Sequence, residues 1–268
     1  MSWDERIARA RSLGRSGSPA SDILIFYATL AEYQRSVRVP SATIQPDGSV
    51  RDFENAIDFD AASRAVAPFL TWLQRNGPAT LAQHASGWRS IEPQRWRDLM
   101  IERVVEGEID PGGDAEATAF VVDAILQPHA ESAAAALRDN ASALPAMAAS
   151  RRCPVCGGAP VVAALREEGH GARRVLICGL CASEWSFQRV RCPACEEGRF
   201  DALPVYTADG TEHVRVDACD SCRTYLKTVD LTKDGLAVPL VDDLATLPLD
   251  LWARDRGYHR LHPNLLRL

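Results

Sequence analysis

Eight cysteines are the residues of this 268-residue chain whose type and spacing could do chemistry. They form four CxxC pairs with none left over: Cys153/Cys156, Cys178/Cys181, Cys192/Cys195 and Cys219/Cys222. A CxxC turn can place both sulfurs on one side of a tight loop, and two facing turns supply four thiolates for tetrahedral zinc or iron. A thioredoxin-type redox site needs only one pair, at the start of a helix that follows a strand. Four pairs therefore predict metal coordination.

An internal repeat predicts which pairs share a metal ion. The stretch "RCPVCGG" from residue 152 recurs as "RCPACEEG" from residue 191, and "RRVLICGLCASEW" is answered by "HVRVDACDSCRTYLK". Each repeat unit thus holds two pairs. The simplest assignment of metal ligands is Cys153, Cys156, Cys178 and Cys181 for the first ion, and Cys192, Cys195, Cys219 and Cys222 for the second. A cross-braced arrangement, which joins the first pair with the third and the second with the fourth, is the alternative.

At a minimum, these sites are predicted to have a structural role. Units of about forty residues usually need a metal, disulfides or assembly to stay folded, and a tetrathiolate metal contributes on the order of 10 kcal/mol. Four sulfurs leave no open position for a substrate, and no carboxylate–histidine constellation resembles an active site. We therefore expect neither catalytic residues nor an enzyme. His170 and His213 are expected to be loop residues, because sulfur already fills each site.

The elements around these sites change character along the chain. Apolar side chains recur at helical spacing in the segments 18–37, 60–78, 92–108 and 114–128, and an Ala-rich helix is expected over 130–139. Pro68 predicts a kink or a break, and Pro128 predicts a helix end. We therefore expect an all-α domain over residues 1–140, and a linker over residues 141–152, which are small and polar-leaning with one proline.

Short β-like runs at 160–165, 174–177 and 214–217 replace the helical periodicity in the cysteine-rich part. The expected units are a first four-cysteine metal module over residues 153–190, a second over 191–228, and a C-terminal segment over 229–268. That last segment is predicted to form a hairpin around 233–235 and then one packing helix from about Asp242 to Arg256. The predicted fold class is α+β: a helical N-terminal domain, two tandem metal modules of the zinc-ribbon type with four cysteines each, and a C-terminal helix.

Composition bears on the compartment and on possible partners. The N-terminus carries charges where a signal peptide needs an apolar run, and no stretch of about 18 apolar residues occurs. We expect a cytoplasmic protein without membrane insertion, whose thiols stay reduced. The net charge of −6 argues against a nucleic-acid partner. A zinc-ribbon nucleic-acid adaptor, suggested by the tandem units and local arginines, and a CxxC thiol–disulfide oxidoreductase are kept as alternative hypotheses.

The combination of motifs also resembles a known family. A helical part followed by "RCPVCGGAPV", "LICGLCASEW", "RVRCPAC", "CDSCRTYLK" and "VDDLATLPLDLWARDRGY" is similar to the formate dehydrogenase accessory proteins of the FdhE type. The resemblance is close over residues 150–268 and one of general character before them. It implies a cytoplasmic assembly factor needed for activity of a molybdenum- or tungsten-dependent formate dehydrogenase, whose catalytic subunit it binds. It also implies that all eight cysteines hold two rubredoxin-like metal centres associated with iron, although thiolate ligands alone accept zinc equally.

Overall fold

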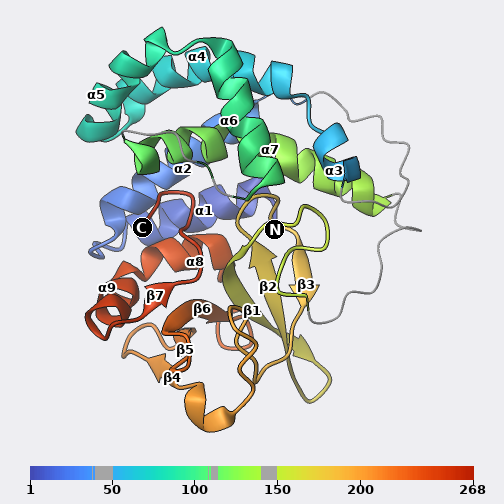
Figure 1. The fold of residues 1–268 in the computed structure, drawn as a ribbon. Helices are drawn as coiled ribbons and strands as arrows, with labels where there is room; N and C mark the ends of the chain where they lie inside the picture. Colours follow the sequence, from blue (N-terminus) through green and yellow to red (C-terminus); the bar gives the residue numbers. More distant parts are fainter. Residues whose placement is uncertain (38, 40–50, 108, 110–113, 140–149) are drawn as a thin grey trace.

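The chain folds into a helical part and a β-sheet part that meet along a shared interface (Figure 1). The computed structural model describes residues 1–37, 39, 51–107, 109, 114–139 and 150–268. Most of the expected linker, residues 141–149, lies outside the described residues. The predicted α+β class is confirmed, with helices first, a sheet that holds two clusters of four cysteines, and helices again near the C-terminus.

Seven α-helices are described before residue 140. They are α1 Trp3–Gly14, α2 Ser21–Ser36, α3 Arg51–Asn55, α4 Phe59–Asn76, α5 Ala79–Gly87, α6 Pro93–Val105 and α7 Ala115–Asp139, with a 3-10 helix Trp88–Ser90 before α6. The first helix begins with a capping box, in which Ser2 accepts from the backbone of Glu5 and the Glu5 carboxylate accepts from the backbone of Ser2. None of the described helices combines the length and the apolar character needed to cross a membrane.

The long helix α7 is the centre of the helical part. Every residue from 118 to 130 is buried, so this stretch is covered on all sides by other elements. The predicted helix end at Pro128 is wrong, because α7 continues through it to Asp139. A proline inside a helix costs about 3 kcal/mol, which the burial of this helix offsets. Helix α4 likewise runs through Pro68 without a break.

One sheet contains the strands of both cysteine units. The strands are β1 Pro160–Glu168, β2 Gly171–Cys178, β3 Glu184–Ser186, β4 Val205–Thr207, β5 Val214–Ala218, β6 Thr224–Asp230 and β7 His259–Arg260. Their order is β3-β2-β1-β6-β5-β4, and β7 pairs with the first two residues of β6. Neighbours within each unit are antiparallel, whereas β1 and β6 are parallel, with Ala163 opposite Thr228. The two repeat units are therefore joined edge to edge through β1 and β6.

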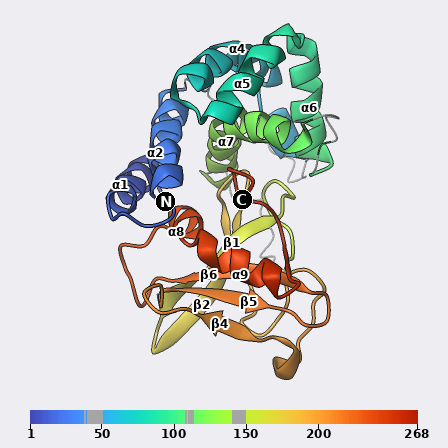
Figure 2. The same cartoon turned by 90° about the vertical axis from the view of Figure 1, so that its left-hand side faces the viewer.

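The C-terminal segment departs from its prediction in two respects. Residues 231–237 form turns that lead directly into α8, Pro239–Ala245, so the expected hairpin is wrong. The expected single helix is two, because α9, Leu247–Asp255, starts anew after Thr246. Pro248 stands in the first turn of α9 and has no N–H to donate to a carbonyl of the preceding turn. In Figure 2, α8 lies between the helical part and the sheet, and α9 crosses the face of the sheet.

Two hydrophobic cores follow from this arrangement. The larger core runs from the helices through α8 into the sheet and includes all four cysteines of the first unit. The smaller core lies on the other side of the sheet, where Leu249 and Ala253 of α9 and Tyr258 pack on β1, β2, β5 and β6. The first cysteine cluster is therefore part of the main core of the protein.

Candidate metal centres

The first cluster gathers four buried sulfurs between the helices and the sheet. Cys153 and Cys156 precede β1, whereas Cys178 ends β2 and Cys181 follows it. All four Sγ atoms lie within 4.8 Å of one another, with 3.6 Å from Cys153 to Cys181 and 3.3 Å from Cys156 to Cys178. Helix α7 supports the second turn, since the side chain of Gln127 donates to the carbonyl of Gly179 next to Cys178 at 3.3 Å.

The second cluster repeats this geometry in the other repeat unit. Its four Sγ atoms also lie within 4.8 Å, with 3.7 Å from Cys192 to Cys222 and 3.7 Å from Cys195 to Cys219. It is less protected than the first, because Cys195 is exposed and Cys222 is half-buried. The sulfurs of the chain thus gather as the internal repeat predicted, and the cross-braced arrangement is not adopted.

All four CxxC turns share one backbone pattern. In each, the N–H of the first cysteine donates to the carbonyl five residues later, at 2.8 to 3.0 Å. The residue after each second cysteine has a positive φ: Gly157 at 72°, Ala182 at 52°, Glu196 at 65° and Arg223 at 59°. A left-handed conformation costs a non-glycine residue about 1–2 kcal/mol. Three of the turns therefore hold strain that the surrounding fold must offset.

Glycine and backbone N–H groups let the sulfurs approach one another at the first centre. The N–H groups of Gly158 and Leu180 point at the sulfurs of Cys156 and Cys178, each at 3.4 Å. A Cβ on Gly158 would lie only 3.1 Å from the Cys178 sulfur and 3.2 Å from the Cys156 sulfur. Gly158 thus leaves the space that the sulfurs occupy, and the N–H groups stabilise negative charge on them.

The sulfur distances and the donor set fit a metal ion. Four thiolates at about 2.3 Å from a tetrahedral zinc or iron ion lie about 3.8 Å apart, close to the distances in both clusters. A disulfide bond needs about 2.05 Å, and all eight cysteines are free. The eight cysteines could therefore hold two ions, four cysteines to each.

The ionisation of the thiols depends on their surroundings. Burial raises the pKa of the Cys181 thiol well above its usual value, and burial also raises the pKa of Cys192. At Cys222, burial is outweighed by hydrogen bonds from the hydroxyl and backbone of Thr224, which lower the pKa to about 7. Metal binding at these clusters must displace protons from buried thiols, so that metal uptake and proton release are linked.

A third group of potential ligand atoms was not evident in the sequence. Atoms of His213, Asp234 and Asp242 lie within 4.8 Å of one another, although His213 is 29 residues from Asp242 in the chain. The Arg9 guanidinium of α1 already binds both carboxylates, at 2.8 Å from Asp234 and 2.5 Å from Asp242. This group is therefore an ion-pair joint between the helical part and the C-terminal segment. His170 is exposed in the β1–β2 turn, as expected.

A buried charge network on β6 was also missed from the sequence. Lys227 of β6 is fully buried, and its Nζ lies 3.2 Å from Asp243 and 2.5 Å from Asp250. Arg260 binds the same two carboxylates at 2.5 and 2.6 Å, and the Tyr225 hydroxyl donates to Asp250 at 2.7 Å. Two cations and two anions alternate here, and they fasten α8, α9 and β7 to β6.

Comparison with known proteins gives consistent matches over this architecture. A family model described as "FdhE, central domain" matches residues 152–189, and one described as "FdhE, C-terminal domain" matches residues 190–267. A "Protein FdhE homolog" from Aquifex aeolicus is 36% identical over 116 residues, which are 42% of this chain and 41% of that relative. The matched segment thus spans about two fifths of the Aquifex protein.

Two further matches extend over almost the whole chain. A "Protein FdhE homolog" from Edwardsiella ictaluri is 30% identical over 285 residues, covering 96% of this chain and 85% of the relative. The crystal structure of the FdhE protein from Pseudomonas aeruginosa matches with a TM-score of 0.76 and 27% identity, covering 99% of this chain and 95% of that one. The resemblance seen in the sequence motifs is therefore confirmed, and this chain belongs to the FdhE family.

Proposed function

We propose that this protein is a cytoplasmic accessory factor for a molybdenum- or tungsten-dependent formate dehydrogenase and that it binds the catalytic subunit of that enzyme. Membership of the FdhE family supports this proposal, because the motifs at the cysteine clusters and in the C-terminal segment resemble formate dehydrogenase accessory proteins. The protein has an assembly role in this proposal and catalyses no reaction of its own.

We further propose that each cysteine cluster binds one metal ion through all four of its sulfurs. The observation that carries this proposal is the convergence of the eight sulfurs into two groups of four, each within 4.8 Å. A thiol–disulfide oxidoreductase would need one reactive pair, whereas here each CxxC pair faces a second pair. Rubredoxin-like iron is the metal that the family resemblance favours, and zinc fits the same ligands.

The two centres differ in a way that suggests different roles. The first is enclosed in the main core, so its metal stabilises the joint between the helices and the sheet. The second has one exposed and one half-buried cysteine, so its metal is open to contact from solvent or from a bound protein. We assign the structural role to the first centre and a role at the client-binding surface to the second.

A co-purification experiment tests the client proposal. The full chain with an affinity tag would be isolated anaerobically from cells that produce a formate dehydrogenase, and the gene would be deleted in a parallel strain. We expect the catalytic subunit to co-purify and formate dehydrogenase activity to be lost in the deletion strain. Full activity in that strain, together with the absence of a complex, would reject the assembly role.

Whether the second centre contributes to client binding needs its own comparison. Cys195→Ser changes the exposed ligand of the second centre, and Cys178→Ser changes a buried ligand of the first. With equal amounts of folded protein, C195S should lower the yield of co-purified catalytic subunit more than C178S does. An unchanged yield from C195S would place the client surface elsewhere on the molecule.

A further inference from the structure

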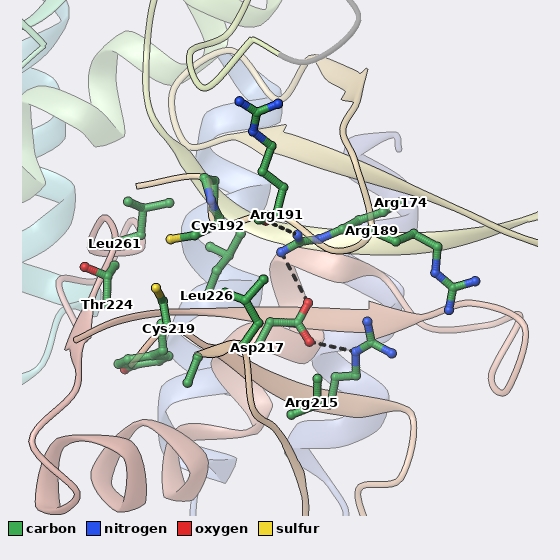
Figure 3. Close-up of a pocket in the computed structure, with 15 residues that line it drawn as sticks. Arg174, Arg189, Arg191, Cys192, Arg215, Asp217, Cys219, Thr224, Leu226 and Leu261 are labelled. Atoms are coloured by element: carbon green, nitrogen blue, oxygen red, sulfur yellow. Dashed lines mark hydrogen bonds and ion pairs between the residues drawn. The ribbon is translucent and has the colours of Figure 1, made fainter. Parts of the chain in front are cut away.

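A small pocket beside the second cysteine cluster is lined by an unusual number of arginines. It has a volume of about 50 Å³ and lies between β2, the segment after β3, and the strands β5 and β6 (Figure 3). Its charged lining residues are Arg174, Arg189, Arg191, Arg215 and Asp217. Four arginines thus line a space with one carboxylate on its wall, in a chain whose overall charge is negative. The guanidinium of Arg174 lies at this carboxylate, whereas that of Arg191 points away from it (Figure 3).

The carboxylates near the pocket neutralise these arginines only in part. Asp217 is shared, because it lies 3.2 Å from Arg174 and 2.8 Å from Arg215. Arg191 pairs with Glu196 at 3.3 Å, and Arg189 is exposed and donates to the carbonyl of Ala172 at 3.3 Å. Four arginines therefore meet two carboxylates within ion-pair distance among the described residues, and the positive charge that these carboxylates leave unpaired faces Cys192 and Cys219 of the second cluster.

The deepest of these arginines retains an unused donor. The side chain of Arg174 is only 2% exposed, and Figure 3 shows its guanidinium in the middle of the pocket, bridging to Asp217. Its Nε is buried and has no hydrogen-bond partner among the described residues. Buried guanidinium N–H groups are normally satisfied, so the unpaired Nε of this pocket-lining arginine is a donor that is free to bind an acceptor.

We propose that this pocket is a binding site for a small oxyanion, such as a free carboxylate or phosphate. Guanidinium groups form charge-assisted and often bidentate hydrogen bonds with planar carboxylates and with phosphate. A volume of about 50 Å³ is that of roughly three or four water positions, which admits an anion of this size and excludes a nucleotide. Arg174 supplies the buried donor, and Arg189 and Arg215 supply charge at the entrance.

The other explanation of these arginines is that they only balance the thiolates of the second cluster. Cys192 and Cys219 line the same pocket, and a divalent metal on four thiolates has a formal charge of −2. Both explanations account for arginines at this place, but only the proposed site predicts a saturable anion complex. The two are therefore separated by a binding measurement on the metal-loaded full chain.

The experiment is a calorimetric titration of the anaerobically purified full chain with sodium acetate and with sodium phosphate. Chloride at equal ionic strength serves as the reference anion, because it screens charge without offering oxygen acceptors. We expect one saturable site for an oxyanion. Arg189→Ala, which removes an exposed residue, should weaken it about tenfold, and Arg174→Lys, which keeps the charge and loses the planar donor fork, should weaken it similarly.

Arg173→Ala is the matched control. Arg173 is the neighbour of Arg174 on β2, but it does not line the pocket and instead contacts Glu168 and Ser186. R173A should bind the anion as the unchanged protein does, and circular dichroism would confirm that each variant is folded. Absence of saturable binding, an equal response to chloride, or an equal loss in R173A and R189A would each overturn the proposed site.

Discussion

Lys227 offers the sharpest test of how the C-terminal segment is held on the sheet. The chain has two lysines, of which Lys227 is fully buried between Asp243 and Asp250, whereas Lys233 is exposed and donates to the carbonyl of Glu212. Lys227→Met keeps most of the apolar stem and removes the charge. Two buried carboxylates then remain with one cation, Arg260.

The expected loss follows from the burial of that network. Removing one partner of a buried ion pair costs about 3–5 kcal/mol, which is a large share of the roughly 5–15 kcal/mol that typically stabilises a protein. Lys233→Met, as the matched control, should change the free energy of unfolding by less than about 0.5 kcal/mol. The double variant Lys227→Met/Asp250→Asn restores equal numbers of charges and should recover much of the loss.

The pH dependence of the loss has a definite sign. Burial raises the pKa of the Asp243 carboxyl, but the charges of Arg260 and Lys227 outweigh burial and hold that pKa below its usual value. A depressed carboxyl pKa contributes stability above the unfolded value of about 3.9 and loses it only as the pH falls through the lower folded value. In K227M the pKa of the Asp243 carboxyl rises, so that this group can take up a proton as the pH falls from about 7 to about 5. The stability lost by K227M relative to the unchanged protein should therefore shrink over this pH range.

Urea denaturation followed by circular dichroism measures these effects. All variants would be compared at the same protein and metal concentrations, because bound metal adds its own stabilisation. At a slope of about 3 kcal/mol/M, a loss of about 3 kcal/mol lowers the urea midpoint by about 1 M. A loss in K227M no larger than that in K233M, or a penalty independent of both pH and the second substitution, would refute the network as described.

Three further predictions concern the metal centres and the joint between the two parts. Gly158→Ala should lower metal affinity at the first centre, because the added Cβ would crowd two sulfurs. Gly157→Ala should cost only about 1 kcal/mol of stability, because its Cβ would enter open space and only the positive φ is unfavourable. Metal titrations of both variants check this difference. A chelator should remove metal in two phases, the faster from the centre with the exposed Cys195, and a single phase would contradict the assigned exposure. Arg9→Ala should cost about 1–3 kcal/mol in urea denaturation, because it leaves the carboxylates of Asp234 and Asp242 without their arginine.

Short-range features of the sequence predicted the cysteine clusters well. Each CxxC turn is local, and the repeat from residue 152 to residue 191 pairs the turns without knowledge of the fold. The strands around Val162, Leu176 and Val216 were also visible as apolar β-type runs. The parallel pairing of β1 with β6 could not be predicted, because it joins strands that lie far apart in the chain and leaves no local pattern.

The missed features depend on tertiary packing. A lysine in the strand sequence "TYLKTVD" is typical of an exposed face, and only the folded chain brings Asp243, Asp250 and Arg260 around it. Pro128 is a helix stop by local rules, but the buried surface of α7 keeps the helix continuous. The left-handed residues after the CxxC pairs were foreseeable only at Gly157, because alanine, glutamate and arginine at the other three turns give no such signal.

Metal content and coordination of the anaerobically purified chain test the central claim most directly. Elemental analysis with X-ray absorption at the edge of the bound metal reports the number of ions for each chain and their ligands. Two ions for each chain, each with four sulfur ligands at about 2.3 Å, are predicted. A natively folded chain that contains no metal and has eight titratable thiols would contradict the claim.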